Sequence, residues 1–260
     1  MGVALITKRA KAILLACVGF SLWPADTAAQ ATQDQWRTLP ARVYININGG
    51  YQQGTSFTEL LSETLYDETA TYTSTHSIPD GTFFDGAAGV RFWKNLAFGV
   101  AVSSSSTSGS AQVVGNVPHP LFYSRPRTVT GDRPTVDHRQ IAYHGQLTWF
   151  VPLTDKLDVA ISGGPSIYSV DQQVLSQVTV NNSGERYDTA SIAQMLNKTA
   201  NGSGFGGNIG FDITYLFTDM LGGGLMLRWG SGSVELGSAT SSKSIEVGGL
   251  QVGLGARVRF

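Results

Sequence analysis

Cysteine is almost absent from the 260 residues, because the one cysteine, Cys17, lies close to the N-terminus. If this segment is removed from the mature chain, a disulfide, a thiolate metal site and a cysteine nucleophile are all excluded. The tetrapeptide Leu14–Cys17 also loosely matches a lipobox, in which the cysteine would become a lipidated N-terminus. Apolar residues continue beyond Cys17, and this favours an ordinary secretory signal.

The N-terminal segment has the three parts of a secretory signal peptide. Basic residues precede an apolar run over 12–23, and Ala29–Ala31 forms a small-residue cleavage site. The run is shorter than the roughly 20 residues that a membrane-spanning helix needs. We therefore predict a signal peptide over 1–31, a short periplasmic segment over 32–40 and one domain over 41–260.

Charge is also scarce, because charged residues make up only 14% of the chain. Without the predicted signal peptide, 15 basic and 18 acidic residues remain, and the net charge of −3 gives no electrostatic case for binding nucleic acid. Beyond the signal, no apolar run is long enough to span a bilayer as a helix. A secreted chain of this kind, with 31 glycines, is either a soluble β protein or a membrane β-barrel.

Strict alternation at the C-terminus marks a strand with two unlike faces. From Leu250 to Phe260 every second residue is apolar, and the residues between them are Gln, Gly or Arg. The same period of two recurs in seven earlier segments, so we predict an all-β chain with eight strands. These strands begin near residues 43, 84, 96, 141, 157, 205, 221 and 250.

Short connections alternate with long ones between these strands. Lys94–Asn95, Thr154–Lys156 and Thr218–Met220 are too short for anything but antiparallel hairpins. Short turns at one end, long loops at the other and an even strand count predict an eight-stranded antiparallel up-and-down transmembrane β-barrel, with both barrel termini periplasmic. The predicted long loops cover residues 53–81, about 108–138, about 173–203 and 237–244.

The polar row of each strand is expected to face the lumen. It consists mostly of Gly, Ala, Ser and Thr, which would make a poor soluble surface but suit a narrow interior. An arginine turned toward lipid costs about 2–4 kcal/mol at the bilayer midplane, so Arg91, Arg228 and Arg257 should point inward and meet aspartates. A periplasmic soluble β-barrel remains the alternative fold. The predicted lumen cluster comprises Asp85, Arg91, His144, Gln146, Asp158, Asp212, Arg228 and Arg257.

Aromatic residues near the short turns predict an interfacial girdle. Trp93, Trp149, Phe150 and Phe217 belong to this group. The strands of about ten residues are long enough to cross an apolar band of about 25 Å.

The segment Gly248–Phe260, GGLQVGLGARVRF, and the turn pattern over 41–260 resemble the small eight-stranded outer-membrane proteins typified by the OmpA transmembrane domain, OmpX and Ail. The resemblance implies a location in the bacterial outer membrane, surrounded by lipid and lipopolysaccharide. It also implies that the terminal aromatic, Phe260, acts as a signal to the barrel-assembly machinery. Unlike full-length OmpA, the chain is expected to have no periplasmic peptidoglycan-binding domain.

Candidates for catalysis are sparse. Outer-membrane lipid A deacylases use Ser and His on a barrel wall, so His144 with Ser162 or Ser166 and the pair His76–Ser77 are candidates, although no activated-serine motif is present. The glycine-rich stretch 202–207 lacks the lysine of a phosphate loop. No spacing of His, Asp or Glu indicates a metal site, and no cofactor is expected.

The predicted second loop is basic and rich in proline. Its residues could meet lipopolysaccharide phosphates or an acidic surface polymer. Interleaved acids, Asp132 and Asp137, favour solvated loop charge instead. The candidate binding residues are His119, Arg125, Arg127 and Arg133.

The leading hypothesis is a non-enzymatic barrel that supports the envelope or binds an unknown extracellular ligand through its long loops. The alternatives are a narrow OmpW-like channel for small solutes and a lipid A-modifying enzyme. An interior that side chains just fill argues against free passage through eight strands.

Overall fold

The computed structural model describes residues 41–238 and 241–260, so the predicted signal peptide and the segment 32–40 lie outside the described residues. Among the described residues, no helix is long and apolar enough to cross a membrane. The strands are β1 (Val43–Gln52), β2 (Thr55–Leu65), β3 (Glu68–Ile78), β4 (Gly81–Trp93), β5 (Leu96–Val117), β6 (Arg127–Pro152), β7 (Leu157–Ser183), β8 (Thr189–Leu216), β9 (Leu221–Ser238) and β10 (Ser241–Arg259).

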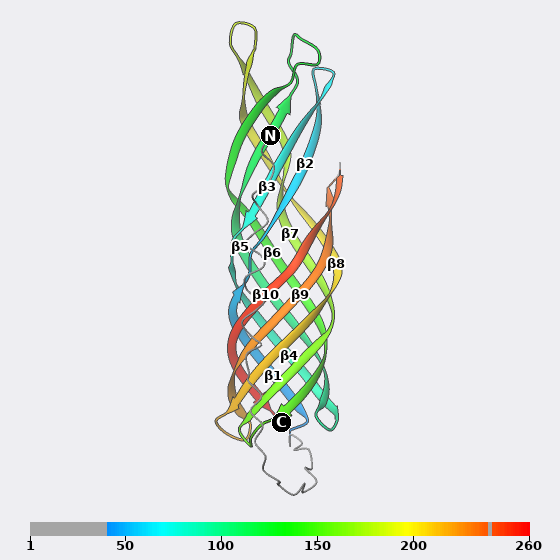
Figure 1. Cartoon of the computed structure of the whole chain (residues 1–260), viewed down its shortest axis with the longest axis vertical. Helices are drawn as coiled ribbons and strands as arrows, with labels where there is room; N and C mark the ends of the chain where they lie inside the picture. The colour runs from blue at the N-terminus through cyan, green and yellow to red at the C-terminus, as the bar shows by residue number, and fades with distance from the viewer. Residues whose placement is uncertain (1–40, 239–240) are drawn as a thin grey trace, which may run out of the picture. The chain divides into compact units, whose positions relative to one another are not determined.

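Eight of these strands close into an antiparallel ring (Figure 1). β1 pairs with both β4 and β10, and the ring continues from β4 through β5, β6, β7, β8 and β9. The amide of Phe260 donates to the carbonyl of Val43 at 2.9 Å, which joins the two ends of the ring beside the short turns. The predicted all-β class and the eight-stranded barrel are confirmed.

The predicted long loops are wrong over most of their length, because these segments are strands. Residues 53–81 form the hairpin β2–β3, whose turn places Tyr66 and Asp67 at positive φ. Residues 108–117 and 127–138 extend β5 and β6, and 173–183 and 189–203 extend β7 and β8. Backbone pairing therefore continues far beyond the short-turn half of the barrel.

Beyond the pair His138 and Gln172, β6 and β7 separate and the barrel becomes two layers. One layer is β2–β3–β5–β6, in which β3 pairs with the extension of β5, and the other is the β7–β8 hairpin. Apolar side chains fill the space between the layers: Leu61, Ala70, Tyr72, Val113, Val117, Val129, Leu175 and Val178.

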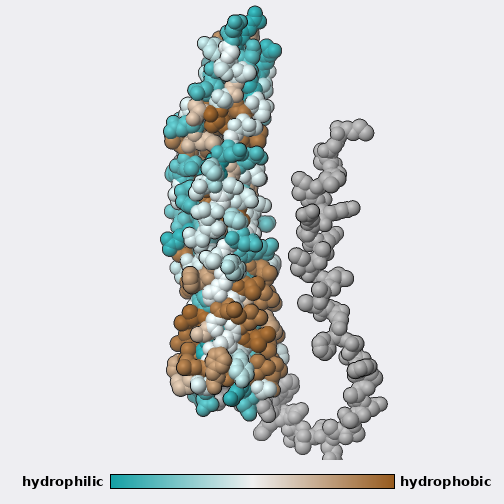
Figure 2. Space-filling model, turned by 90° about the vertical axis from the view of Figure 1, so that its left-hand side faces the viewer, coloured by the Kyte–Doolittle hydropathy of each residue, from teal (hydrophilic) through white to brown (hydrophobic). Residues whose placement is uncertain are grey.

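Along the long strands, the apolar side chains change from the outward row to the inward row. In β9, Leu225, Leu227 and Trp229 point outward, whereas Val234 and Leu236 further along the same strand point inward. Figure 2 shows the result, with hydrophobic residues gathered toward the short turns and mostly polar ones further along, apart from one smaller apolar patch. We call the outward apolar zone the belt; its members include Ile47, Phe84, Val100, Leu147, Ile161, Ile209, Leu225 and Leu254.

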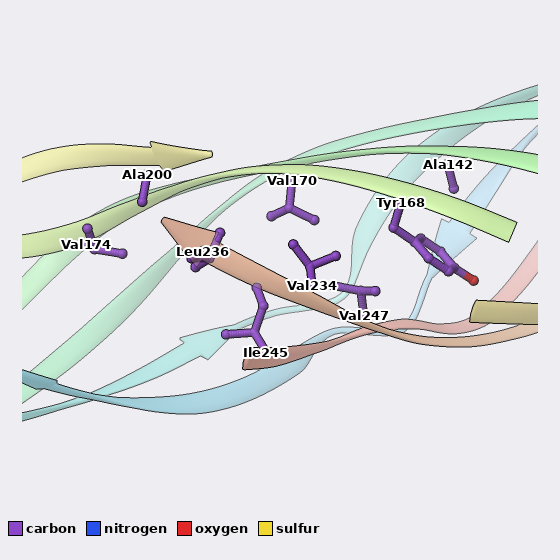
Figure 3. Close-up of a cluster of buried hydrophobic side chains, with 9 residues drawn as sticks. All are labelled: Ala142, Tyr168, Val170, Val174, Ala200, Val234, Leu236, Ile245 and Val247. Atoms are coloured by element: carbon purple, nitrogen blue, oxygen red, sulfur yellow. The ribbon is translucent and has the colours of Figure 1, made fainter. Parts of the chain in front are cut away.

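An apolar core fills the interior directly beyond the belt (Figure 3). Tyr168 and Val170 of β7 meet Val234 of β9 and Val247 of β10 there. A barrel with apolar side chains on its outer face in one half therefore continues as a barrel with an apolar core in the other.

Candidate functional site

The lumen inside the belt holds a buried layer of charge. Strand alternation turns Arg228 of β9 inward, where its Nη1 lies 2.6 Å from Oδ2 of Asp85 on β4. The other carboxylate oxygen of Asp85 accepts from Asn48 Nδ2 at 2.8 Å, and Gln251 Oε1 accepts from Arg228 at 3.4 Å. These contacts compensate two charges that are almost completely removed from water.

A second pair lies nearer the short turns. Arg257 donates two hydrogen bonds to Asp212, from Nε to Oδ1 at 3.0 Å and from Nη2 to Oδ2 at 2.5 Å, in the bidentate geometry of an arginine–carboxylate pair. Its Nη1 also donates to Asn48 Oδ1 at 2.7 Å, which links the two pairs. Asp158, the third predicted aspartate, lies 3.6 Å from Arg259.

Arg259 was not among the predicted lumen residues, although it lies on the same inward row as Arg257 and the alternation alone would have found it. Its guanidinium is 5.2 Å from the ring centroid of Phe150 and 5.5 Å from that of Tyr44. Phe150 was predicted in the outer girdle, but it is only 3% exposed and packs edge-on against Tyr44 inside the lumen.

The other predicted lumen residues lie on the same inward rows but are not all in contact. His144 forms a hydrogen bond with a serine hydroxyl through each ring nitrogen, with Nδ1 2.8 Å from Ser166 and Nε2 3.3 Å from Ser103. Gln146 Nε2 donates to Asn208 Oδ1 at 3.4 Å. Arg91 lies at the short-turn end, away from the ion pairs, and its amide donates to the Arg42 carbonyl.

The serine–histidine candidates do not form a catalytic arrangement. No carboxylate among the described residues hydrogen-bonds to His144, and both of its serines lie in the buried lumen. His76 contacts Ser74 and Glu59 through one and the same nitrogen, Nε2, at 3.2 and 3.1 Å. A general base needs one nitrogen for the nucleophile and the other for its orienting partner, so this geometry is unsuited to serine activation.

Side chains fill the lumen at the level of the belt. One hollow at this level has a volume of about 30 Å³ and lies between Tyr44, Asp85, Gln146, Thr148 and Arg228. This space holds about one water molecule.

The four candidate loop residues do not share one surface. Arg133 and Arg127 lie on the inward row of β6 and are buried between the layers. His119 is buried too, and its Nδ1 accepts the amides of Leu121 and Phe122 at 3.1 and 3.2 Å. Of the four, Arg125 is the exposed one, and its guanidinium lies 5.5 Å from the ring centroid of Phe122.

Arg133 faces two other ionisable groups between the layers. Glu59 Oε2 accepts from His76 Nε2 and from the amide of Leu175 on the opposite layer at 3.2 Å. Burial lowers the pKa of Arg133, and the charge of Glu59 opposes that shift. The carboxylate on β2 therefore ties the two layers together and offsets a buried cation.

Three turns at the far end of the strands form a surface that we call the turn cluster: residues 66–68, 118–126 and 184–188. Arg127 holds two of them, donating from Nη1 to the Tyr187 carbonyl at 2.6 Å and from Nη2 to the Pro118 carbonyl at 2.8 Å. Glu68 accepts the amide of Ser124 at 3.0 Å, which ties in the third turn. The exposed large hydrophobic residues of the cluster are Tyr66, Leu121, Phe122, Tyr123 and Tyr187.

No family model and no curated protein sequence matches the chain. Solved structures match over most of its length. The outer membrane protease OmpT from Escherichia coli is 9% identical with a TM-score of 0.50, and the match covers 87% of this chain and 99% of that one. The protein has the fold of an outer-membrane β-barrel.

Two further structures are more distant in shape. Neisserial surface protein A has 11% identity and a TM-score of 0.40, covering 84% of this chain and 97% of its own. The outer membrane protein OprG from Pseudomonas aeruginosa has 13% identity and a TM-score of 0.41, covering 85% and 96%. At these identities the likeness concerns the fold alone, and the function has to be argued from the residues. Among the described residues, no group of three or more His, Cys, Asp or Glu side chains is placed to hold a metal ion.

Proposed function

We propose that the protein is a non-enzymatic barrel of the bacterial outer membrane that binds an extracellular protein partner through its turn cluster. The belt would lie in the membrane among lipid and lipopolysaccharide, with the short turns and the ends of β1 and β10 on the periplasmic side. In this proposal Phe260, an exposed aromatic at the end of β10, serves as the assembly signal, as in the OmpA, OmpX and Ail group that the sequence resembles.

The observation that carries the proposal is the combination of rigidity and exposed aromatic surface in the turn cluster. Arg127 and Glu68 fix the three turns to one another, so little ordering entropy is lost on binding. Tyr123 is 78% exposed and Leu121 59% exposed, next to the exposed Arg125. Tyrosine and arginine on a preorganised surface are the residues that dominate protein–protein binding energy.

The alternatives find less support. A channel needs a water-filled path, whereas Arg228 and Arg257 with their aspartates occupy the lumen. OmpT is described as a protease, but a shared fold at 9% identity does not transfer an activity. A lipid A-modifying enzyme would require a serine and histidine accessible to the membrane, and His144 is buried in the lumen.

Orientation is the first part of the proposal to test. Once the signal peptide is cleaved, the mature chain has no cysteine, so Tyr123→Cys introduces a unique thiol. A membrane-impermeant maleimide should label this variant on intact cells. The matched variant Asp219→Cys, in a short turn, should be labelled only after the cells are opened. The reverse pattern would refute the proposed orientation.

Binding is tested with the purified barrel in detergent against an immobilised panel of extracellular matrix and serum proteins. A partner that is retained should lose at least tenfold in affinity with the double variant Leu121→Ala/Tyr123→Ala. The control Tyr143→Ala removes an exposed tyrosine from the belt instead. Absence of any partner together with large, steady single-channel openings in planar bilayers would favour the channel.

A further inference from the structure

A hollow of about 250 Å³ opens in the barrel wall at the upper edge of the belt. The ladder between β1 and β10 ends at the pair Gln52 and Gln251. Beyond it, the Gln53 amide donates to the Leu250 carbonyl at 2.8 Å, and β10 then continues paired with β9 while the chain turns into β2 (Figure 1). The hollow lies in the gap that this divergence leaves.

The wall of the hollow is polar and almost free of charge. Gln52, Ser105, His138 and Gln140 contribute buried side chains. The lining contains no lysine or arginine among the described residues, and its one acidic group is the exposed Glu246. A phosphate or a carboxylate would therefore find no cation here, and an uncharged ligand is favoured.

Hydrogen-bonding capacity in the wall is left unused by the protein. Gln140 is only 4% exposed, yet within the described chain its side chain forms no hydrogen bond. His138 engages Gln172 Oε1 through Nδ1 at 2.7 Å, which leaves Nε2 available. Gln52, in contrast, is fixed, because it donates to the Gly248 carbonyl and accepts from Gln251. A ligand with several hydroxyl groups would satisfy both a free amide and a free imidazole nitrogen.

The strand wall beside Gln52 is shaped by two glycines. Gly248 and Gly249 have φ values of 108° and 96°, a region that side chains rarely adopt. A Cβ on Gly248 would lie 2.3 Å from the Gly230 carbonyl oxygen, so a side chain at this position would clash with β9. Trp229, 54% exposed, lines the rim one residue away from this contact.

We propose that the hollow binds a single neutral sugar ring. Amide, hydroxyl and imidazole groups on the wall match the vicinal hydroxyls of a sugar. The volume lies just below the range of about 300–1,000 Å³ typical of drug-sized ligands, which fits one ring. The ring would come either from the oligosaccharide of lipopolysaccharide or from a diffusible glycoside, because the hollow opens at the level where membrane and solvent meet.

The test uses the whole mature barrel in detergent. Methyl hexopyranosides of different stereochemistry are titrated by saturation-transfer-difference NMR and calorimetry, with inorganic phosphate as the anionic comparison. At least one neutral glycoside should bind while phosphate does not. Gln140→Leu should weaken that binding about tenfold, the loss expected for one or two hydrogen bonds. The control Gln194→Leu changes an exposed glutamine of β8 and should leave binding unchanged.

A second arm distinguishes the sources with the deacylated oligosaccharide released from lipopolysaccharide. Tighter binding of this oligosaccharide than of any methyl glycoside assigns the site to the membrane's own glycolipid, and the reverse assigns it to a diffusible sugar. Binding of phosphate but of no sugar, or equal binding by the Gln140→Leu protein, would overturn the proposal. Each variant is first required to show the heat-dependent gel shift of a folded barrel. The test involves no turn-cluster residue, so its result is independent of the proposed partner binding, whereas the lipopolysaccharide source rests on the proposed placement of the belt in the membrane.

Discussion

Tyr44 occupies lumen space that two glycines leave open. Its hydroxyl would lie 2.2 Å from a Cβ on Gly99 and 2.5 Å from one on Gly89. The ring also packs edge-on against Phe150 and carries the Arg259 guanidinium. Because Gly89 on β4 and Gly99 on β5 have no side chains, the Tyr44 ring and the Arg259 guanidinium fit inside a lumen of eight strands.

Gly99→Ala should destabilise the barrel by about 1–3 kcal/mol, because the added methyl forces Tyr44 out of its position. Urea unfolding in lipid vesicles measures the loss. Gly86→Ala is the matched control on the neighbouring strand, since a Cβ there meets nothing within 4 Å. The double variant Tyr44→Ala/Gly99→Ala should lose clearly less stability than the sum of the two single losses, because only the 2.9 Å approach of the Cβ to the Ala88 carbonyl oxygen remains. Additive losses would mean that the clash with Tyr44 is not the cause.

Removing one member of a buried ion pair is expected to cost more than replacing both. Asp85→Ala leaves Arg228 buried without its carboxylate, and the free energy of unfolding should fall by about 3–5 kcal/mol. Asp85→Leu/Arg228→Met, an apolar pair of similar volume, should recover most of the loss. The exposed Glu235→Ala should change stability by less than about 0.5 kcal/mol. Equal losses in the single and double variants would argue against an electrostatic cause.

At the scale of single residues, alternation predicts the facing of a side chain but not its partner. The period of two in each strand can be seen in the sequence, and it places three of the predicted charges on inward rows: Asp85, Arg228 and Arg257. The pairing of Arg228 with Asp85 joins β9 to β4 across the lumen, and no local pattern contains that information. Phe150 was misassigned because it follows Trp149 directly, and neighbours on a strand face opposite sides.

At the scale of elements, the short turns were predictable and the long connections were not. The turns between β4 and β5 and between β6 and β7 follow from their length. Residues 108–117 alternate as regularly as the belt, but Val113 and Val117 face inward and the outward row is polar apart from Val114, largely the reverse of the pattern found at Val100. A search for outward apolar rows therefore ends each strand at the edge of the belt.

His138 lies at the junction where β6 and β7 separate, outside the belt. Burial lowers its pKa below the ordinary 6.5, and the hydrogen bond to Gln172 opposes this shift. The unfolded chain then takes up the proton at a higher pH than the folded chain, so stability should fall as the pH drops below about 6.5 and level off below the lowered value.

The variant His138→Gln lacks this contribution, and its stability should decline less than that of the unmodified protein between pH 7.5 and 5.5. Urea unfolding at the two pH values gives the comparison, in which all other titrating groups are common to both proteins. Two neighbours bear on the titration of His138: Glu246 on the rim of the hollow and Gln172 across the β6–β7 ladder. If the free energy of unfolding declined equally in both proteins, protonation of His138 would not be coupled to folding.

At the scale of the whole molecule, the reversal of alternation predicts where the hydrocarbon of a bilayer would end. Val100 and Val114 provide a matched pair on β5, since both are valines on its outward row and are 57% and 42% exposed. Fourteen residues of a strand tilted by about 40° separate them by about 35 Å along the barrel axis, more than the apolar band of about 25 Å. A nitroxide at Val100→Cys should therefore be accessible to oxygen in lipid, and one at Val114→Cys to a water-soluble nickel relaxant. Lipid contact at both positions would contradict this boundary. The bilayer would then have to cover the polar outward row between Val100 and Val114, which costs free energy that a bilayer limited to the belt does not lose.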